Sequence, residues 1–232
     1  MAILARIVNY ARQSFLESLE QSEREALLAL GHRRAWQKGE AVFHAGDRAD
    51  SAIVVAAGLL KIHRLTAAGA EVVLGLSGPG DLLGEISAVR DALRSASATA
   101  LEAVDALVIP VPELRAFLSA HPAATVGLLA MTLRRLYSAD ERRLEFATAE
   151  ALARVASRLV ELADRFGERL AGGAVEVALP INQEELASWS AASRESTARS
   201  LRTLRELGLI ETRRMRLTVL DLEGLRLHAA RL

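Results

Sequence analysis

The stretch Gly84-Glu85-Ile86-Ser87, followed after six residues by Arg94-Ser95-Ala96, marks the centre of the predicted fold. It places one acid close to one arginine in a segment that is otherwise small and apolar. A planar guanidinium suits phosphate oxygens, and a carboxylate in a tight glycine-flanked turn suits a sugar hydroxyl. The layout therefore predicts a pocket for a sugar phosphate. The alternative is that Glu85 and Arg94 form an ion pair across a turn.

Short apolar runs lie on both sides of this stretch, from Trp36 to about Pro110. They are Ala41-Val42-Phe43, Ala52-Ile53-Val54-Val55, Leu59-Leu60-Lys61-Ile62, Val72-Val73-Leu74 and Ala106-Leu107-Val108-Ile109. Glycines at 39, 46, 58, 69, 78, 80 and 84 punctuate the region. Many short strands at this spacing predict a small antiparallel barrel or roll.

Residues 13–31, ahead of the strands, predict short helices. Ser22 followed by Glu25 is typical of a capping box, and Gly31 is a candidate C-terminal cap.

A long helical pattern follows the strands, from Pro122 to about Glu168, and it is nearly free of glycine. One face carries residues spaced three or four apart, namely Val126, Leu129, Leu133, Leu136, Asp140 and Leu144. Such a narrow apolar seam is typical of a coiled-coil dimer. We expect a bend near residues 146–148, and then a second amphipathic helix that ends at Gly167.

The last part of the chain has the pattern of a winged helix. Residues 174–179 predict a strand, and Asn182 or Gln183 begins a short helix. After a turn at 191–193, Ser193 caps a longer helix that runs through Leu207 and ends at Gly208. Residues 209–212 and 216–220 predict two strands around a basic tip. Helix, turn, capped helix and hairpin together predict this fold.

Composition narrows the function classes. The chain has 232 residues, no cysteine and a formal net charge of zero. No apolar run approaches the ~18 residues of a membrane span, and the start lacks the pattern of a signal peptide. We therefore expect a cytoplasmic protein with no membrane partner. The sequence offers no nucleophile–base set, no phosphate-cradling glycine loop and no metal-ligand spacing, so it does not predict an enzyme.

The charge distribution says more than the net charge. Between Ser193 and Arg216 the chain has three glutamates against seven arginines, at 194, 199, 202, 205, 213, 214 and 216. A local basic surplus on a predicted helix and wing is the electrostatic footprint expected on double-stranded DNA.

Three blocks of motifs now support a resemblance. The first runs from Lys38-Gly39-Glu40 through Gly46-Asp47 to Gly58. The second joins Pro79-Gly80-Asp81, Gly84-Glu85 and Arg94-Ser95-Ala96. The third runs from Asn182-Gln183-Glu184-Glu185-Leu186-Ala187 to Ser193-Arg194-Glu195. In this order they resemble the cyclic AMP receptor protein / fumarate-nitrate regulator (CRP/FNR) family of bacterial transcription factors, over nearly the whole chain.

The resemblance implies an α+β fold in three parts. Residues 1–120 would form a cyclic-nucleotide-binding, jelly-roll-like β-roll with flanking helices. Residues 121–147 would form a dimerisation helix, and residues 148–232 a winged helix-turn-helix that binds DNA.

In the ligand pocket, the resemblance assigns Arg94 to a cyclic phosphate, with a hydroxyl from Ser95 and a backbone N–H from Ala96. Glu85 would accept from the ribose 2′-hydroxyl, and Gly84 would let the backbone come close. Ile86 completes this side of the pocket. The implied effector is cyclic AMP. The family's oxygen sensors need clustered cysteines, and its haem sensors replace the Gly-Glu motif, so we expect no iron–sulfur cluster, haem or other metal.

Two positions depart from the family pattern. Ala139 and Asp140 stand where the cyclic AMP receptor has a threonine and a serine that read the adenine. The Asp140 carboxylate could accept from the amino group of adenine or from two N–H groups of guanine. It could equally pair with Arg143 or with an arginine of a second subunit. Cyclic GMP, another effector or no effector therefore remain alternatives.

In the DNA reader, Arg194, Glu195 and Arg199 lie on one predicted helix face. Arginine pairs with guanine O6/N7 and glutamate with cytosine N4. The resemblance implies TGTGA-like half-sites in an inverted repeat, with RNA polymerase as a further partner. Ser193 would contact a phosphate, and the wing arginines, including Arg213 and Arg214, would hold the backbone. Asn182, Gln183 and Thr197 complete the predicted DNA-binding set. The alternative for Arg202 and Arg205 is a solvated face paired with Glu206.

Together these features predict a homodimeric, ligand-switched transcription regulator. The alternative from another class, an enzyme or channel subunit regulated by a cyclic nucleotide, needs a catalytic domain or membrane spans. We expect the chain to have room for neither.

Overall fold

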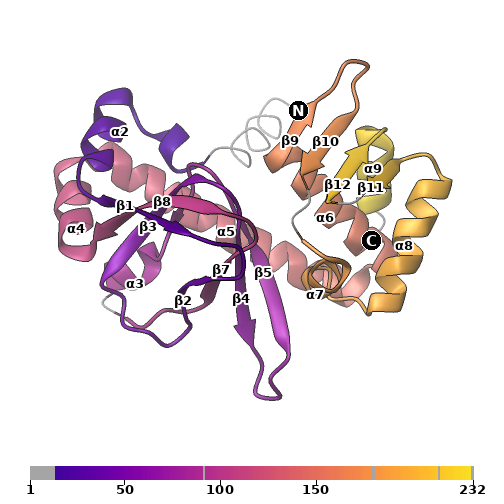
Figure 1. Ribbon diagram of the computed structural model, residues 1–232, viewed down its shortest axis with the longest axis horizontal. Coiled ribbons are helices and arrows are strands. Elements are labelled where there is room, and N and C mark those ends of the chain that lie inside the picture. The colour runs from indigo at the N-terminus through magenta and orange to yellow at the C-terminus, as the bar shows by residue number, and fades with distance from the viewer. Residues whose placement is uncertain (1–13, 91, 179–180, 214, 231–232) are drawn as a thin grey trace. The chain divides into compact units, whose positions relative to one another are not determined.

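The structure is a computed structural model that describes residues 14–90, 92–178, 181–213 and 215–230. The chain forms two compact units, Met1–Tyr137 and Ser138–Leu232 (Figure 1). The boundary falls inside a long helix, later than the predicted end of the roll at residue 120. The predicted class, an α+β chain with a roll, a long helix and a winged helix-turn-helix, is confirmed.

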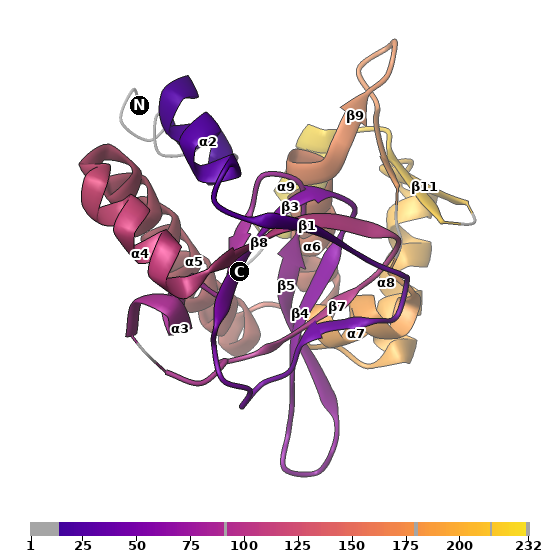
Figure 2. The same cartoon turned by 60° about the vertical axis from the view of Figure 1, so that its left-hand side comes forward.

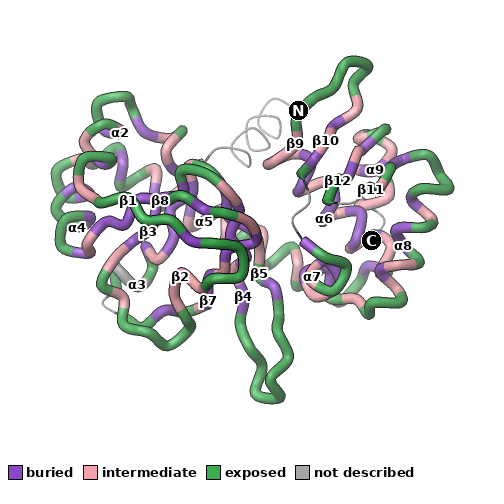
Figure 3. The backbone as a smooth tube through the Cα atoms, viewed as in Figure 1, coloured by how far each residue is buried: buried purple, intermediate pink, exposed green. Residues whose placement is uncertain are grey.

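The first unit contains the roll, built from two antiparallel sheets. One sheet has the order β1-β8-β3-β6, formed by His32–Trp36, Val104–Pro110, Ser51–Ala57 and Leu82–Leu83. The other has the order β2-β7-β4-β5, formed by Ala41–Phe43, Ser97–Ala100, Leu60–Leu65 and Glu71–Ser77. All five predicted strands are present, and β1, β6 and β7 come in addition. Figure 3 shows the exposed tip of the β4–β5 hairpin, whose residues 64–72 all face solvent.

Both faces of the first sheet are covered, which explains why β3 is apolar at successive positions. Neighbouring residues of a strand point to opposite faces. Ile53 and Val55 lie in the core between the two sheets, together with Trp36 and Leu60. Ala52 and Val54 instead join a second core beneath the helices.

The helices that cover this sheet are η1 (Leu16–Ser18), α2 (Gln21–Leu28), α4 (Val111–Ala120) and the start of α5 (Pro122–Thr148). Figure 2 shows α2, α4 and α5 gathered on one side of the strands. Their apolar faces meet at residues such as Phe15, Leu27, Leu114 and Phe117, all of which are buried. A short helix, α3 (Glu85–Arg90), follows β6 and carries the motif acid.

The predicted caps of the first helices are wrong by a few residues. The capping box of α2 joins Glu20 and Glu23 rather than Ser22 and Glu25, because the helix begins one residue before Ser22. The C-cap is Ala29 rather than Gly31. Gly31 is needed for another reason, since a Cβ there would lie 2.5 Å from the carbonyl oxygen of Val108 on the neighbouring strand.

The second unit contains the end of α5 and a winged helix-turn-helix. After α5 the chain turns at residues 149–150, next to the predicted bend, and continues as α6 (Ala151–Phe166). A sheet of order β11-β12-β10-β9 packs with three more helices. Its strands are Ile210–Arg213, Arg216–Val219, Val175–Ala178 and Gly167–Arg169, and the helices are α7 (Gln183–Trp189), α8 (Arg194–Glu206) and α9 (Leu222–Ala229). The sequence did not predict β9 or α9.

No single helix within the described ranges is long and apolar enough to cross a bilayer. Among the described residues, α4 and α5 taken together have the length and composition of a span, but they are bent by 113°.

Candidate functional site

The Arg94 side chain is buried, with 5% of its surface exposed. Its Nη2 donates to the carbonyl oxygen of Ser51 at 2.6 Å, its Nη1 lies 3.4 Å from that of Gly84, and its guanidinium lies over the Phe43 ring at 4.4 Å. The nearest carboxylate is that of exposed Asp50, 4.0 Å away. Within the described part of the chain, Nε has no hydrogen-bond partner. Arg94 is therefore a buried cation with little compensating charge.

Burial lowers the pKa of Arg94 from its ordinary value, and the charges of Asp50, Asp47 and Glu85 offset this only in part. A buried charge is costly unless it is paired, so the site favours an anion beside the guanidinium. The backbone of Arg94 is fixed by two hydrogen bonds to the preceding loop, from its N–H to Asp47 and from the Gly46 N–H to its carbonyl. The backbone that carries the guanidinium is therefore held in place by the loop at residues 46–47.

Gly84 allows this arrangement for two reasons. Its φ of +78° lies in the region that disfavours side chains. A Cβ at this position would also overlap Nη1 of Arg94. The glycine and the arginine that the sequence singled out are thus in direct contact.

Glu85 begins α3 and is also buried. Its carboxylate accepts from Arg135 of α5 at 2.5 Å rather than pairing with Arg94, so the predicted alternative of an ion pair across the turn is wrong. Arg135 also donates to the carbonyl oxygen of Leu82 at 2.8 Å. Arg135 was not among the predicted site residues, because it lies 50 residues along the chain from Glu85 and no local pattern links the two.

The remaining predicted ligand residues are less enclosed. Ser95 is exposed and Ala96 is half-buried, and both follow Arg94 on the way to β7. Ile86 is also exposed, and it lines a groove of about 700 Å³ between α3, α4 and α5. Ile86 therefore faces the helices that cover the roll.

Ala139 and Asp140 lie on α5, in the second unit. The Asp140 carboxylate accepts from Arg143 at 2.9 Å, which is one of the pairings considered from the sequence. This side chain is exposed, so it carries no cost of burial in the single chain.

The winged helix presents the predicted DNA-reading side chains to solvent. Ser193 caps α8 and accepts from the Ser196 N–H at 3.1 Å, as predicted. Arg194, Glu195 and Arg199 are exposed, and none of them forms an ion pair or side-chain hydrogen bond with any described residue. Three unpaired polar groups on one helix face can contact base edges or phosphates.

The burial of Thr197 contradicts its predicted role in DNA binding. Its side chain is fully buried on the inner face of α8, the face that also carries the buried Ser200 and Leu201. A side chain without exposed surface has nothing to offer to DNA, so we assign Thr197 to packing. Its hydroxyl lacks a hydrogen-bond partner among the described residues, as does that of buried Ser190.

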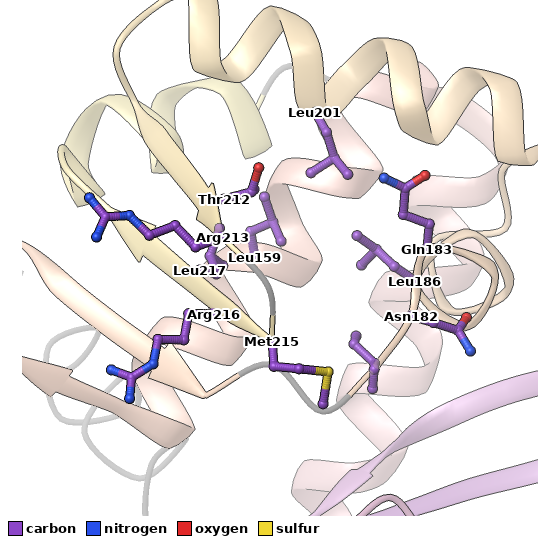
Figure 4. Close-up of a pocket in the computed structure, with 11 residues that line it drawn as sticks. Leu159, Asn182, Gln183, Leu186, Leu201, Thr212, Arg213, Met215, Arg216 and Leu217 are labelled. Atoms are coloured by element: carbon purple, nitrogen blue, oxygen red, sulfur yellow. The ribbon is translucent and has the colours of Figure 1, made fainter.

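The start of α7 and the wing enclose a small cavity of about 400 Å³ (Figure 4). Its floor is apolar, with Leu159, Leu186, Leu201 and Leu217 among the lining residues. Asn182, Gln183, Arg213, Met215 and Arg216 lie around it, and the two arginines point away from it on the same side. Asn182 caps α7 with its side-chain oxygen, which accepts from the N–H groups of Glu184 and Glu185.

The wing arginines are placed differently from one another. Arg213 is exposed and lies 3.6 Å from Glu211, whereas Arg216 pairs with Glu176 at 2.5 Å. Arg214 lies outside the described residues. Arg205 of α8 donates to Thr212 at 2.9 Å rather than pairing with Glu206. Arg213 therefore lies exposed beside one carboxylate, whereas Arg205 is held against strand β11.

No group of three or more histidine, aspartate or glutamate side chains in the described segments is arranged to hold a metal ion. His63 of β4 has Nε2 2.9 Å from the Thr99 hydroxyl and Nδ1 3.2 Å from the Glu71 carboxylate.

Comparisons with known proteins match a part of each unit to a domain family. Residues 33–121 match the cyclic nucleotide-binding domain family, and residues 153–227 match the Crp-like helix-turn-helix domain family. The chain is 30% identical to the CRP-like cAMP-activated global transcriptional regulator of Mycobacterium tuberculosis, over 93% of this chain and 96% of that one.

Two further relatives extend the comparison. The chain is 31% identical to the cyclic AMP receptor protein of Thermus thermophilus, over 83% of this chain and 85% of that one. It is also similar to the crystal structure of a putative cyclic nucleotide binding protein from Ruegeria pomeroyi. That match has a TM-score of 0.66 and 30% identity, and covers 95% of this chain and 96% of the other.

Proposed function

Because the chain belongs to the CRP/FNR family of transcriptional regulators, we propose that it is a homodimeric regulator that binds palindromic DNA in response to cyclic AMP. The family makes it a DNA-binding regulator with a cyclic nucleotide-binding domain. Beyond this, we propose the identity of the effector, the dimeric state and the palindromic DNA site. The observation that carries the effector is Arg94, a buried guanidinium whose hydrogen bonds go to two main-chain carbonyls and the Ser51 hydroxyl rather than to a carboxylate.

In the proposed complex the cyclic phosphate lies against Arg94, with the hydroxyl of Ser95 and the N–H of Ala96 as further donors. The ribose 2′-hydroxyl donates to Glu85, beside Gly84 and Ile86. A carboxylate accepts several hydrogen bonds, so Glu85 can bind the ribose while Arg135 still donates to it. The names of two relatives, which include cAMP or cyclic AMP, support this choice of effector.

The base is read from α5 in this proposal, by Ala139 and Asp140. Asp140 must then exchange Arg143 for the amino group of adenine. Cyclic GMP is the second candidate, since a carboxylate also suits the two adjacent N–H groups of guanine.

Dimerisation in this proposal uses the apolar seam of α5. Val126, Leu129, Leu133, Leu136 and Leu144 are all exposed in the single chain, although they are large and apolar. A seam of this period is the contact surface of a coiled coil. We assign residues 1–120, 121–147 and 148–232 to the roll, the dimer helix and the DNA reader.

For DNA, we propose that Arg194, Glu195 and Arg199 read TGTGA-like half-sites about one helical turn apart. Ser193 and Arg213 hold phosphates, with Asn182, Gln183 and Arg214 in support. Effector binding shifts the population toward the form that fits both half-sites, which requires a higher affinity for that form. RNA polymerase is the expected partner on the DNA, and the cytoplasm the expected location. The regulators among the relatives favour this role over a catalytic one.

The test is calorimetric titration of the purified protein with cyclic AMP and, separately, with cyclic GMP. We expect micromolar binding of cyclic AMP that Arg94→Leu abolishes. Arg64→Leu, which removes an exposed arginine of β4, is the matched control and should bind like the natural chain. Circular dichroism confirms that each variant is folded.

Other outcomes are equally clear. Preference for cyclic GMP makes Asp140 a guanine reader. Undiminished binding by a folded Arg94→Leu variant contradicts the phosphate assignment. Binding of neither nucleotide overturns the effector, and leaves the DNA-binding role to be tested by itself.

A further inference from the structure

Arg154 of α6 contacts two segments that are far apart in the sequence. Its Nε donates to the carbonyl oxygen of Ser190 at 2.9 Å, and its Nη2 to that of Ala191 at 3.0 Å. Its Nη1 donates to the carbonyl oxygen of Ala149. One guanidinium thus joins the turn between α7 and α8 to the end of α5. All three of these hydrogen bonds go to main-chain carbonyls, and the guanidinium also lies 5.8 Å from the Phe146 ring of α5.

These carbonyls lie at the C-terminal ends of two helices. Ser190 is the C-cap of α7, and Ala149 directly follows the last residue of α5. The last carbonyls of a helix have no partner within it and carry the negative end of the helix dipole. A cation that donates to both ends satisfies them together. The planar fork of arginine can make three such bonds at once, whereas the single ammonium of lysine cannot span them in the same geometry.

The turn that Arg154 holds is also a strained one. Ala191 has a φ of +48°, in the left-handed region that favours glycine. Such a conformation persists only where the surroundings impose it. Ser193, the N-cap of α8, follows two residues later, so the conformation of this turn sets the direction in which α8 leaves α7.

A second arginine on the same face of α6, four residues further on, adds to this connection. Arg158 is buried, pairs with Glu145 of α5 at 2.5 Å, and lies 5.8 Å from the Trp189 ring of α7. The end of α5, α6 and the end of α7 are therefore connected through two arginines, of which only Arg154 reaches the turn before α8.

We infer that Arg154 is a positioning residue for DNA recognition: by holding the α7–α8 turn and the end of α5 together, it fixes the orientation of α8. This inference rests on the proposed use of α8 to read DNA. Arg154 itself touches no DNA in this arrangement.

The test compares Arg154→Lys and Arg154→Met with the natural chain, and Arg165→Met serves as the matched control. Arg165 is another arginine of α6, but it pairs with Glu161 at 3.6 Å. Affinity is measured by fluorescence anisotropy in saturating cyclic AMP, on a duplex with the TGTGA inverted repeat and over a series of salt concentrations. Hydrogen exchange reports on the turn and on the first residues of α8.

We expect both Arg154 variants to bind DNA about tenfold more weakly or worse, with an unchanged slope of log affinity against log salt. Exchange should rise in the turn and the start of α8 in both, and Arg165→Met should change neither. Arg154→Lys is the decisive variant, because it keeps the positive charge and removes the planar guanidinium that makes the three hydrogen bonds.

Three results overturn the inference. If Arg154→Lys binds DNA with the affinity of the natural chain, a positive charge alone is sufficient at this position. A slope that falls by about 0.9 in Arg154→Met identifies a phosphate contact instead. Unchanged exchange in the turn shows that Arg154 does not hold it. If the natural chain with cyclic AMP fails to bind the duplex, the proposed effector or the proposed DNA site is wrong, and the exchange data still decide whether Arg154 holds the turn.

Discussion

At the scale of single residues, polar groups sit in two kinds of buried environment. Arg94 and Glu85 are buried beside partners that a ligand can share or replace. Thr197 is buried with its hydroxyl unpaired among the described residues. Leaving a buried donor unpaired costs about 1–3 kcal/mol. Ligand binding can explain the burial of Arg94 and Glu85, whereas the burial of the Thr197 hydroxyl has no such explanation.

Thr197→Val is therefore expected to stabilise the protein. Valine has nearly the same shape and removes the unpaired hydroxyl, so the free energy of unfolding should rise by about 1 kcal/mol. Urea unfolding measures this change. Thr212→Val is the control, because it removes an acceptor that Arg205 uses, and it should bring no gain. Weaker DNA binding by a stabilised Thr197→Val variant would return Thr197 to the interface.

The spacing of two residues along the sequence does not reveal which residues they contact in the fold. Glu85 and Arg94 are close in the sequence, yet each takes its main contacts elsewhere: Glu85 from Arg135, and Arg94 from Ser51. The partner of a buried charge depends on which chain segments the fold brings together, and no local pattern contains that information.

At the scale of elements, α8 is amphipathic in the way its use requires. Leu201 and Leu204 are buried against the unit, while Arg194, Glu195 and Arg199 face solvent. The capping serine and the apolar period made this helix predictable from the sequence.

Arg194→Ala is expected to lose about 1–3 kcal/mol of binding free energy at one guanine of each half-site. The loss should disappear on a duplex in which that base pair is changed, because the natural chain then loses the same contact. Anisotropy titrations on matched duplexes measure it. Arg202→Ala, which removes an exposed arginine two turns further along α8, is the control. A uniform loss on every sequence, with a lower salt slope, would make Arg194 a phosphate contact.

The elements that the sequence missed are short or weakly patterned. β6 has two residues and β9 has three, and β1 reads His-Arg-Arg-Ala-Trp, with four of its five residues exposed. Such strands exist because a neighbouring strand offers hydrogen bonds, as β8 does for β1. Their own residues carry little β-propensity, so periodicity alone does not find them.

At the scale of the whole molecule, the exposed seam of α5 bears on assembly. Burying a leucine side chain yields about 1.5–3 kcal/mol, and a symmetric dimer buries each seam residue twice. The seam is thus the strongest candidate for the surface between two copies.

Leu133→Glu is expected to raise the dissociation constant of the dimer by about 100-fold or more, because two leucines are lost and two charges are placed face to face. Sedimentation equilibrium measures the change. Leu227→Glu replaces an exposed leucine of α9 and is the control, which should leave assembly unchanged. A Leu133→Glu protein that remains fully dimeric would place the interface elsewhere.

The sequence by itself determined the order of the three parts of the fold, namely the roll, the long helix and the winged helix. These follow from periodicity, turn residues and caps, which act over a few residues. Only the tertiary structure decided that Arg135 faces Glu85, that Thr197 is buried, and that Arg154 joins two helix ends. The reason is physical: a buried polar group must find its partner in space, and the partner can come from any part of the chain.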